Sequence, residues 1–99
     1  MITAVVLIRT DPGQTAAAGE ALADIPEVAE VYSVTGDYDL VALIRVRRYE
    51  EIAAVVPQRI VAVPGVARTN TLLAFRHYSR HDIEGLFSIG LENEPARGG

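Results

Sequence analysis

The sequence predicts an α+β protein with a single four-stranded antiparallel sheet. Four runs have the pattern of strands, at residues 2–9, 28–34, 40–48 and 67–78. In each run, apolar residues occupy either every second position or positions on both faces of the strand. Two helical patterns lie between 11 and 26 and between 49 and 60, so the order is βαββαβ. The second and third strands are joined by only five residues, 35–39, which favours a hairpin. This order is that of a ferredoxin-like sandwich with both helices on one face of the sheet.

The two helices are predicted from their caps and their apolar stripes. Asp11-Pro12-Gly13 offers a cap and a helix-start proline, and the first helix is expected to end before Pro26. Its apolar stripe consists of Ala18, Ala21, Leu22 and Ile25. The second helix begins near Tyr49 and has an apolar side formed by Ile52, Val55, Val56 and Ile60. Pro57 interrupts this pattern and predicts a kink or an early break.

The sheet face opposite the helices carries apolar residues where water would favour polar ones. These residues are Val5 and Leu7 in the first strand and Val41 and Leu43 in the third. A face of this kind needs a cover, and a second copy of the same chain is the simplest candidate. We therefore expect a homo-oligomer, at least a dimer.

Length and composition indicate one domain. Residues 1–91 are expected to form it, with a core at 2–78 and an additional C-terminal helix at about 80–91. That helix has Ile83, Leu86 and Phe87 on one side. Residues 92–99 are expected to be a disordered tail.

Charge and residue usage exclude several classes of function. The net charge is −4 and the nine basic residues are scattered arginines, which disfavours direct nucleic-acid binding. No cysteine is present, so thiol chemistry is excluded. No signal peptide or membrane span is recognisable, so we expect a cytoplasmic protein. His77, His81 and Asp82 lack the spacing of a metal site, and neither a metal nor another cofactor is expected.

The hairpin loop is the first candidate for a ligand site. Gly36 permits a positive φ and leaves backbone N–H groups open, while Asp37 and Asp39 add negative charge beside it. Thr69 and Thr71 are two residues apart on one strand, so their hydroxyls share a face. The alternative is an ordinary turn, and a threonine pair that reflects only β-propensity.

Two segments resemble a known family. TGDYDL at residues 35–40 and PGVARTNT at residues 64–71 look like the C-terminal effector domain of the Lrp/AsnC transcription regulators, also called the regulation-of-amino-acid-metabolism (RAM) domain. The resemblance covers residues 2–78. It implies sheet-to-sheet dimers of αβ-barrel type that assemble into tetramers or octamers, with an amino-acid effector between dimers.

The resemblance also implies roles for individual residues. Gly36 would receive the effector's carboxylate, while Asp39, Thr69 and Thr71 would surround its ammonium group. Asp37 and Tyr38 would line the loop. No helix-turn-helix domain precedes the first strand, so the chain resembles a stand-alone effector domain that acts with full-length regulators.

Three function hypotheses follow. The preferred one is a non-enzymatic module that binds an amino acid or a related metabolite. The second is a small dimeric αβ-barrel enzyme of monooxygenase or isomerase type, although tryptophan is absent and His77 is the one candidate pointing into the sheet interface. The third is a purely structural partner of full-length regulators.

Overall fold

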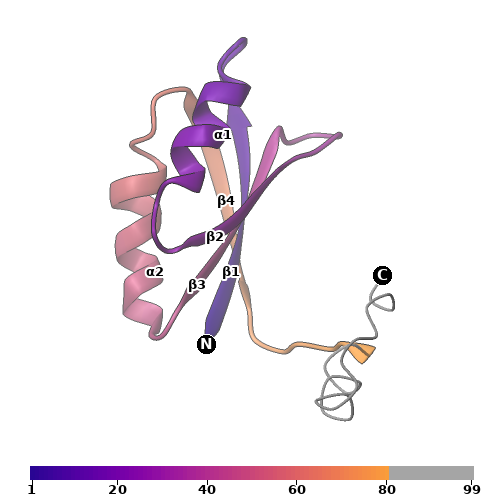
Figure 1. The fold of residues 1–99 in the computed structure, drawn as a ribbon, viewed down its shortest axis with the longest axis vertical. Coiled ribbons are helices and arrows are strands. Elements are labelled where there is room, and N and C mark those ends of the chain that lie inside the picture. Colours follow the sequence, from indigo (N-terminus) through magenta and orange to yellow (C-terminus); the bar gives the residue numbers. More distant parts are fainter. Residues whose placement is uncertain (81–99) are drawn as a thin grey trace.

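The computed structural model describes residues 1–80 and contains one antiparallel sheet with both helices packed on the same face (Figure 1). The sheet has the strand order β2-β3-β1-β4, so β1 lies between β3 and β4. The α+β, ferredoxin-like prediction is confirmed. The elements are β1 (Ile2–Thr10), α1 (Thr15–Ala23), β2 (Val28–Ser33), β3 (Leu40–Val46), α2 (Tyr49–Val55), the π-helical turn η1 (Val56–Ile60) and β4 (Val66–Ala74).

The hydrophobic core lies between the sheet and the helices. Alternate residues of the two central strands supply most of it, because successive side chains of a strand point to opposite faces. The helices contribute part of their predicted stripes, with Ala18, Leu22, Val55 and Ile60 buried. The buried strand residues are Ala4, Val6 and Ile8 of β1, Val28 of β2, and Leu40, Ala42, Ile44 and Val46 of β3.

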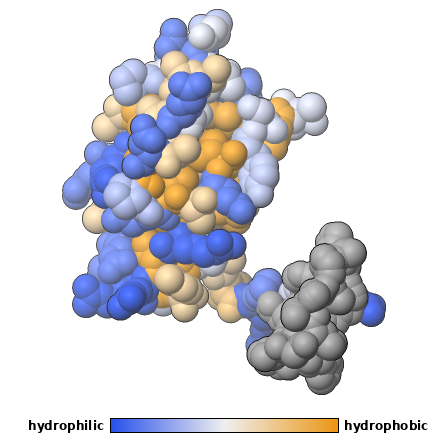
Figure 2. Space-filling view, in the orientation of Figure 1, coloured by the Kyte–Doolittle hydropathy of each residue, from blue (hydrophilic) through white to orange (hydrophobic). Residues whose placement is uncertain are grey.

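The opposite side of the sheet, which we call the open face, is apolar at its centre. The register pairs Val5 with Leu43 and Leu7 with Val41, so these four side chains share that face as predicted. All four are half-buried, and Leu72 of β4, opposite Val5, is 49% exposed. Figure 2, in the orientation of Figure 1, shows a different apolar area, which reaches the surface in the middle of the view, where the helices meet the sheet.

Two predicted boundaries are wrong. Asp11, Pro12 and Gly13 form a turn instead of a helix start, and Gly13 has φ +80°, which an α-helix cannot continue. Helix α1 begins only at Thr15, without a side-chain cap. Strand β4 ends at Ala74 instead of continuing to residue 78, and its last pair with β1 is Thr3–Ala74.

The predicted break at Pro57 is confirmed, in the form of a change of helix type. Helix α2 ends at Val55, and the next turn is π-helical, with Val61 N donating to Val56 O at 2.9 Å. Proline offers no N–H, so the α-helical hydrogen-bond ladder cannot pass through it.

Several predictions concern residues that the structure does not describe. The helix at about 80–91 and the tail at 92–99 lie beyond the described residues, except for Arg80. His81 and Asp82 also lie outside. Within residues 1–80, no helix is long and apolar enough to cross a lipid bilayer.

Candidate ligand-binding site

The tip of the β2–β3 hairpin projects from the body of the domain (Figure 1). Gly36 and Asp37 are exposed there, and Val34 N closes the loop by donating to Asp39 O at 3.0 Å. Gly36 has φ +104°, and no described heavy atom lies within 4 Å of the position that a Cβ would take. Glycine is therefore favoured here by the backbone angle, and the space beside the loop is open to a ligand or another chain.

Asp39 lies at the base of the same loop and is held by β1. Its Oδ2 accepts hydrogen bonds from Thr10 N at 2.8 Å and from Thr10 Oγ1 at 3.2 Å, and its own N–H donates to Ile8 O at 2.8 Å. The hydroxyls of Thr10 and Thr15 are 2.6 Å apart, which extends the network to the start of α1. The carboxylate has about four acceptor positions, so these two bonds leave acceptor capacity for a ligand.

The two threonines of β4 face the helix-covered side of the sheet, at its edge. Thr69 lies opposite Ile8 and Thr71 opposite Val6, so the prediction that both share one face is confirmed. Thr69 is half-buried and Thr71 is exposed. Asp39 and Thr69 flank β1 from opposite sides, so their backbones stand about 10 Å apart, which is two strand spacings.

Tyr38 extends toward the open face instead. Asn70 Nδ2 donates to Tyr38 Oη at 3.5 Å, and Asn70 lies opposite Leu7, on the open face. A single chain therefore does not gather the six candidate residues. It separates them into the loop tip (Gly36 and Asp37), the Asp39 network, the threonine pair on the helix side, and Tyr38 on the other side.

The partners of these residues were missed by the sequence reasoning. Thr10 and Thr15 carry the Asp39 network, and Asn70 meets Tyr38. Strand alternation from Ile8 indicates that Thr10 shares the helix side, and this signal was available in the sequence. A register shift between Arg9 and Thr10 was not foreseeable, and it accompanies the approach of Thr10 to Asp39.

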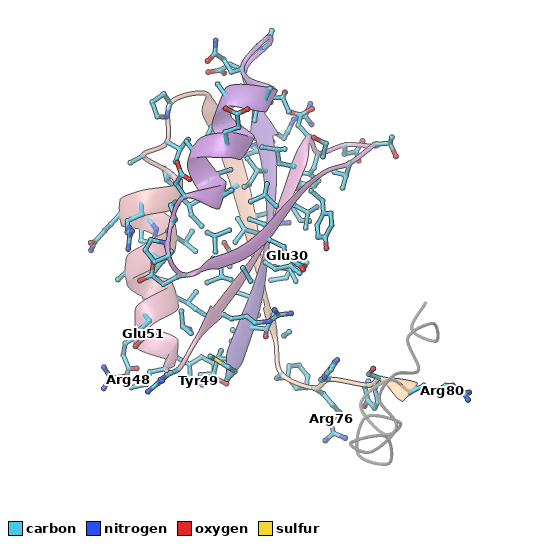
Figure 3. All side chains as sticks on the ribbon, viewed as in Figure 1. Glu30, Arg48, Tyr49, Glu51, Arg76 and Arg80 are labelled. Carbon is cyan, nitrogen blue, oxygen red and sulfur yellow. The ribbon has the colours of Figure 1, made fainter. Side chains whose placement is uncertain are left out.

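One further polar pair lies on the exposed edge strand β2. Tyr32 Oη donates to Glu30 Oε1 at 2.8 Å, and this hydrogen bond, with the charge of the carboxylate, raises the pKa of Tyr32 above its ordinary value. Figure 3 shows Glu30 near the middle of the sheet, far from the loop tip. Tyr32 lies opposite Val41, so this pair borders the apolar centre of the open face.

The chain is similar to known proteins in both sequence and fold. The chain is 36% identical over 73 residues to the HTH-type transcriptional regulator FL11 of Pyrococcus horikoshii, covering 74% of this chain and 48% of that protein. It thus spans about half the length of the curated relatives it matches. The crystal structure of TTHA0845 from Thermus thermophilus superposes with a TM-score of 0.76 at 60% identity, covering 81% of this chain and all of that one.

A third relative is the leucine response regulatory protein LrpA of Mycobacterium tuberculosis. It is 32% identical, has a TM-score of 0.68, and is matched over 78% of this chain and 52% of its own. A model of the Lrp/AsnC ligand-binding domain matches residues 3–83, which include the hairpin loop, both threonines and the open face. The chain therefore belongs to the Lrp/AsnC ligand-binding domain family.

Proposed function

We propose that this chain is a regulatory, non-enzymatic domain that binds an amino acid or a closely related metabolite and works as a homo-oligomer in the cytoplasm. The match of residues 3–83 to the ligand-binding domain carries this proposal. The curated relatives are transcription regulators about twice as long as the matched region. Full-length regulators of this type are therefore candidate partners, and direct DNA binding is not part of the proposal.

The proposed site lies between chains. The exposed N–H groups around Gly36 would hold the carboxylate of the effector, because backbone donors in an open loop suit an anion. Asp39, with Thr69 and Thr71, would hold the ammonium group. Asp37 and Tyr38 would line the loop. Since the loop tip projects from its own domain, a neighbouring chain is needed to close the site, which supports an assembly of dimers.

The experiment that tests this function is a calorimetric titration with amino acids, leucine first, because a 32% identical relative is named for its response to leucine. A ligand that binds only the native state also raises the melting temperature, which allows all twenty amino acids to be screened beforehand. Failure of every amino acid to bind or to stabilise the protein would contradict the proposal.

Asp39→Asn tests the ammonium site. The substitution keeps the shape and removes the charge, so we expect affinity to fall by about ten- to a hundredfold, as for loss of a charge-assisted hydrogen bond. Asp24→Asn, at the exposed end of α1, makes the same change in net charge and should leave affinity unchanged.

The hydrogen bonds to Thr10 give Asp39 a structural role as well, and the two roles are separable. At a temperature where both proteins are fully folded, a purely structural Asp39 leaves ligand affinity untouched and lowers only the melting temperature. Equal affinities for wild type and Asp39→Asn would remove Asp39 from the site.

A further inference from the structure

The loop before β4 lies against the turn that follows β1. Gly65 O accepts a hydrogen bond from Asp11 N at 2.9 Å, which ties the loop to the end of β1. Gly65 has φ +94°, a backbone conformation that favours glycine. A Cβ at this position would also lie 2.7 Å from Gln14 Cβ, closer than two carbon atoms of this kind pack. The proposed function gives no role to this glycine.

The end of β1 is held from both sides at this point. On the β4 side, the register places Thr10 opposite Val66. The next N–H, that of Asp11, donates to Gly65 O. On the β3 side, Thr10 N donates to Asp39 Oδ2 at 2.8 Å, so a side-chain carboxylate takes the place of a backbone acceptor just before β3 begins. Two successive N–H groups of β1 therefore bind the Asp39 carboxylate and the Gly65 carbonyl.

A β-bulge accompanies this arrangement. The register of β1 with β4 shifts between Arg9 and Thr10, and Ala67 is the extra residue that β4 inserts there. Bulges are common beside functional sites, where they change the direction of a side chain. Here the bulge lies two residues before Thr69 on β4 and beside Thr10, the residue that holds Asp39.

The contact with Gln14 reaches the same network from the helix side. Gln14 directly precedes Thr15, the first residue of α1, and the hydroxyls of Thr15 and Thr10 are 2.6 Å apart. Thr10 Oγ1 in turn donates to Asp39 Oδ2 at 3.2 Å. A side chain at position 65 that displaces Gln14 would therefore also displace both threonines that surround this carboxylate.

We infer that Gly65 is a positioning residue of the proposed amino-acid site. Together with Gln14 it fixes the end of β1, and through Thr10 it orients the carboxylate of Asp39. Hydrogen bonds weaken steeply when their geometry is poor, so a misplaced carboxylate holds an ammonium group less well. The inference rests on the proposed function, because it assigns a role within that site.

Gly13→Ala is the matched control for Gly65→Ala. Both glycines have a positive φ, +80° and +94°, so alanine strains the backbone at either position. A Cβ at Gly13, however, meets no described heavy atom within 4 Å, whereas at Gly65 it meets Gln14. The difference between the two variants therefore isolates this contact from the backbone strain.

Hydrogen exchange of the Thr10 amide, followed by NMR, tests the positioning without a ligand. Exchange of the Val6 amide, in the fully buried middle of β1, serves as the reference for global unfolding. Relative to Val6, exchange at Thr10 should become about tenfold faster in Gly65→Ala and stay near the wild-type rate in Gly13→Ala. An equal increase in both variants, or none in Gly65→Ala, would overturn the inference.

Titration calorimetry with leucine tests the consequence for the site. At a temperature where all proteins are folded, Gly65→Ala should weaken binding by about tenfold, and Gly13→Ala should leave it unchanged. Gln14→Gly removes the side chain that a methyl group at position 65 would meet. The double variant Gly65→Ala/Gln14→Gly should therefore regain the affinity of Gln14→Gly alone, and a failure to regain it would contradict the proposed route through Gln14.

This inference and the proposed function can fail separately. If leucine does not bind, the amino acid that raises the melting temperature most takes its place in the titration. Wild-type protein that binds none of the twenty amino acids would contradict the proposed function, and this inference with it. Wild-type binding with equal affinity in Gly65→Ala would overturn this inference alone, because a purely structural glycine lowers the melting temperature and leaves affinity untouched.

Discussion

Neighbouring residues of β3 show how differently the two faces of the sheet are completed. Ile44 is fully buried beneath the helices, whereas Leu43, one residue earlier, is half-buried on the open face. The same contrast holds in β1, where Val6 is fully buried and Val5 is not. Both faces are rich in β-branched and aliphatic residues, so composition alone does not distinguish them.

The difference lies in what covers each face. Burial of apolar surface stabilises by roughly 25 cal/mol per Å², and the helices provide that burial on one side within a single chain. On the open face the same stabilisation is available only from another surface. One face is therefore covered within the single chain, and we propose that the other is covered when two chains associate.

The largest expected effect is on the helix-covered face. Ile44→Ala removes a fully buried side chain from the core and should lower the free energy of unfolding by about 2–5 kcal/mol. Urea denaturation measures this loss, which should not change with protein concentration. Leu43→Ala is the control on the same strand, and its effect should grow weaker as the protein is diluted. Equal, concentration-independent losses in both variants would remove the distinction between the faces.

The second prediction concerns association directly. Leu43→Glu places a charge at the centre of the open face, opposite Val5, without touching the core. A two-fold dimer carries the change twice, so we expect its dissociation constant to rise about a hundredfold, or ~2.7 kcal/mol. Sedimentation at micromolar concentration should show the shift toward monomer. An unchanged assembly, or a wild-type protein that is monomeric, would contradict the proposed dimer face.

The strand and helix pattern was predictable because periodicity depends only on local sequence. Alternation in 2–9 and 40–48 identified both the core residues and the open face, and Pro57 marked the change in the second helix. The end of β4 was not predictable in this way. It depends on where β1 stops pairing, which is a property of register between distant segments.

The candidate site was predictable only in part. The positive φ of Gly36 and the shared face of Thr69 and Thr71 follow from residue type and strand alternation. The contact between Asp39 and Thr10 joins residues 29 positions apart, so no local pattern indicates it.

The third prediction compares the stability effects of glycine-to-alanine substitutions at the loop tip and in helix α1. Gly36→Ala forces a positive φ on a residue with a Cβ and should cost about 1–2 kcal/mol, although the added methyl group meets no described atom. Gly19→Ala in α1 is the matched control. Its Cβ would make ordinary contact with Leu40 at 3.6 Å, and better helix propensity should stabilise by about 0.5–1 kcal/mol. Thermal unfolding of both variants should therefore shift in opposite directions, and a shift of the same sign would contradict the assigned backbone conformation.

The smallest expected effect on stability concerns an ion pair at the surface of the helix-covered side. Arg59 of η1 donates to Glu27 at 2.8 Å, and this pair joins the end of the second helical segment to the turn before β2. The two side chains are 43% and 31% exposed, so solvent screens their attraction and the pair should contribute only about 0.2–1 kcal/mol.

A double-mutant cycle with Arg59→Gln and Glu27→Gln isolates this coupling from the other effects of each substitution. The coupling should shrink as salt is added, because the Debye length falls to about 3 Å at 1 M ionic strength. It should also be the same at all protein concentrations, unlike the effect of Leu43→Glu, since both residues belong to the face that one chain completes. A coupling energy that vanishes on dilution would mean that this ion pair, too, depends on a second copy, and the division of the molecule into a completed face and an associating face would then be wrong.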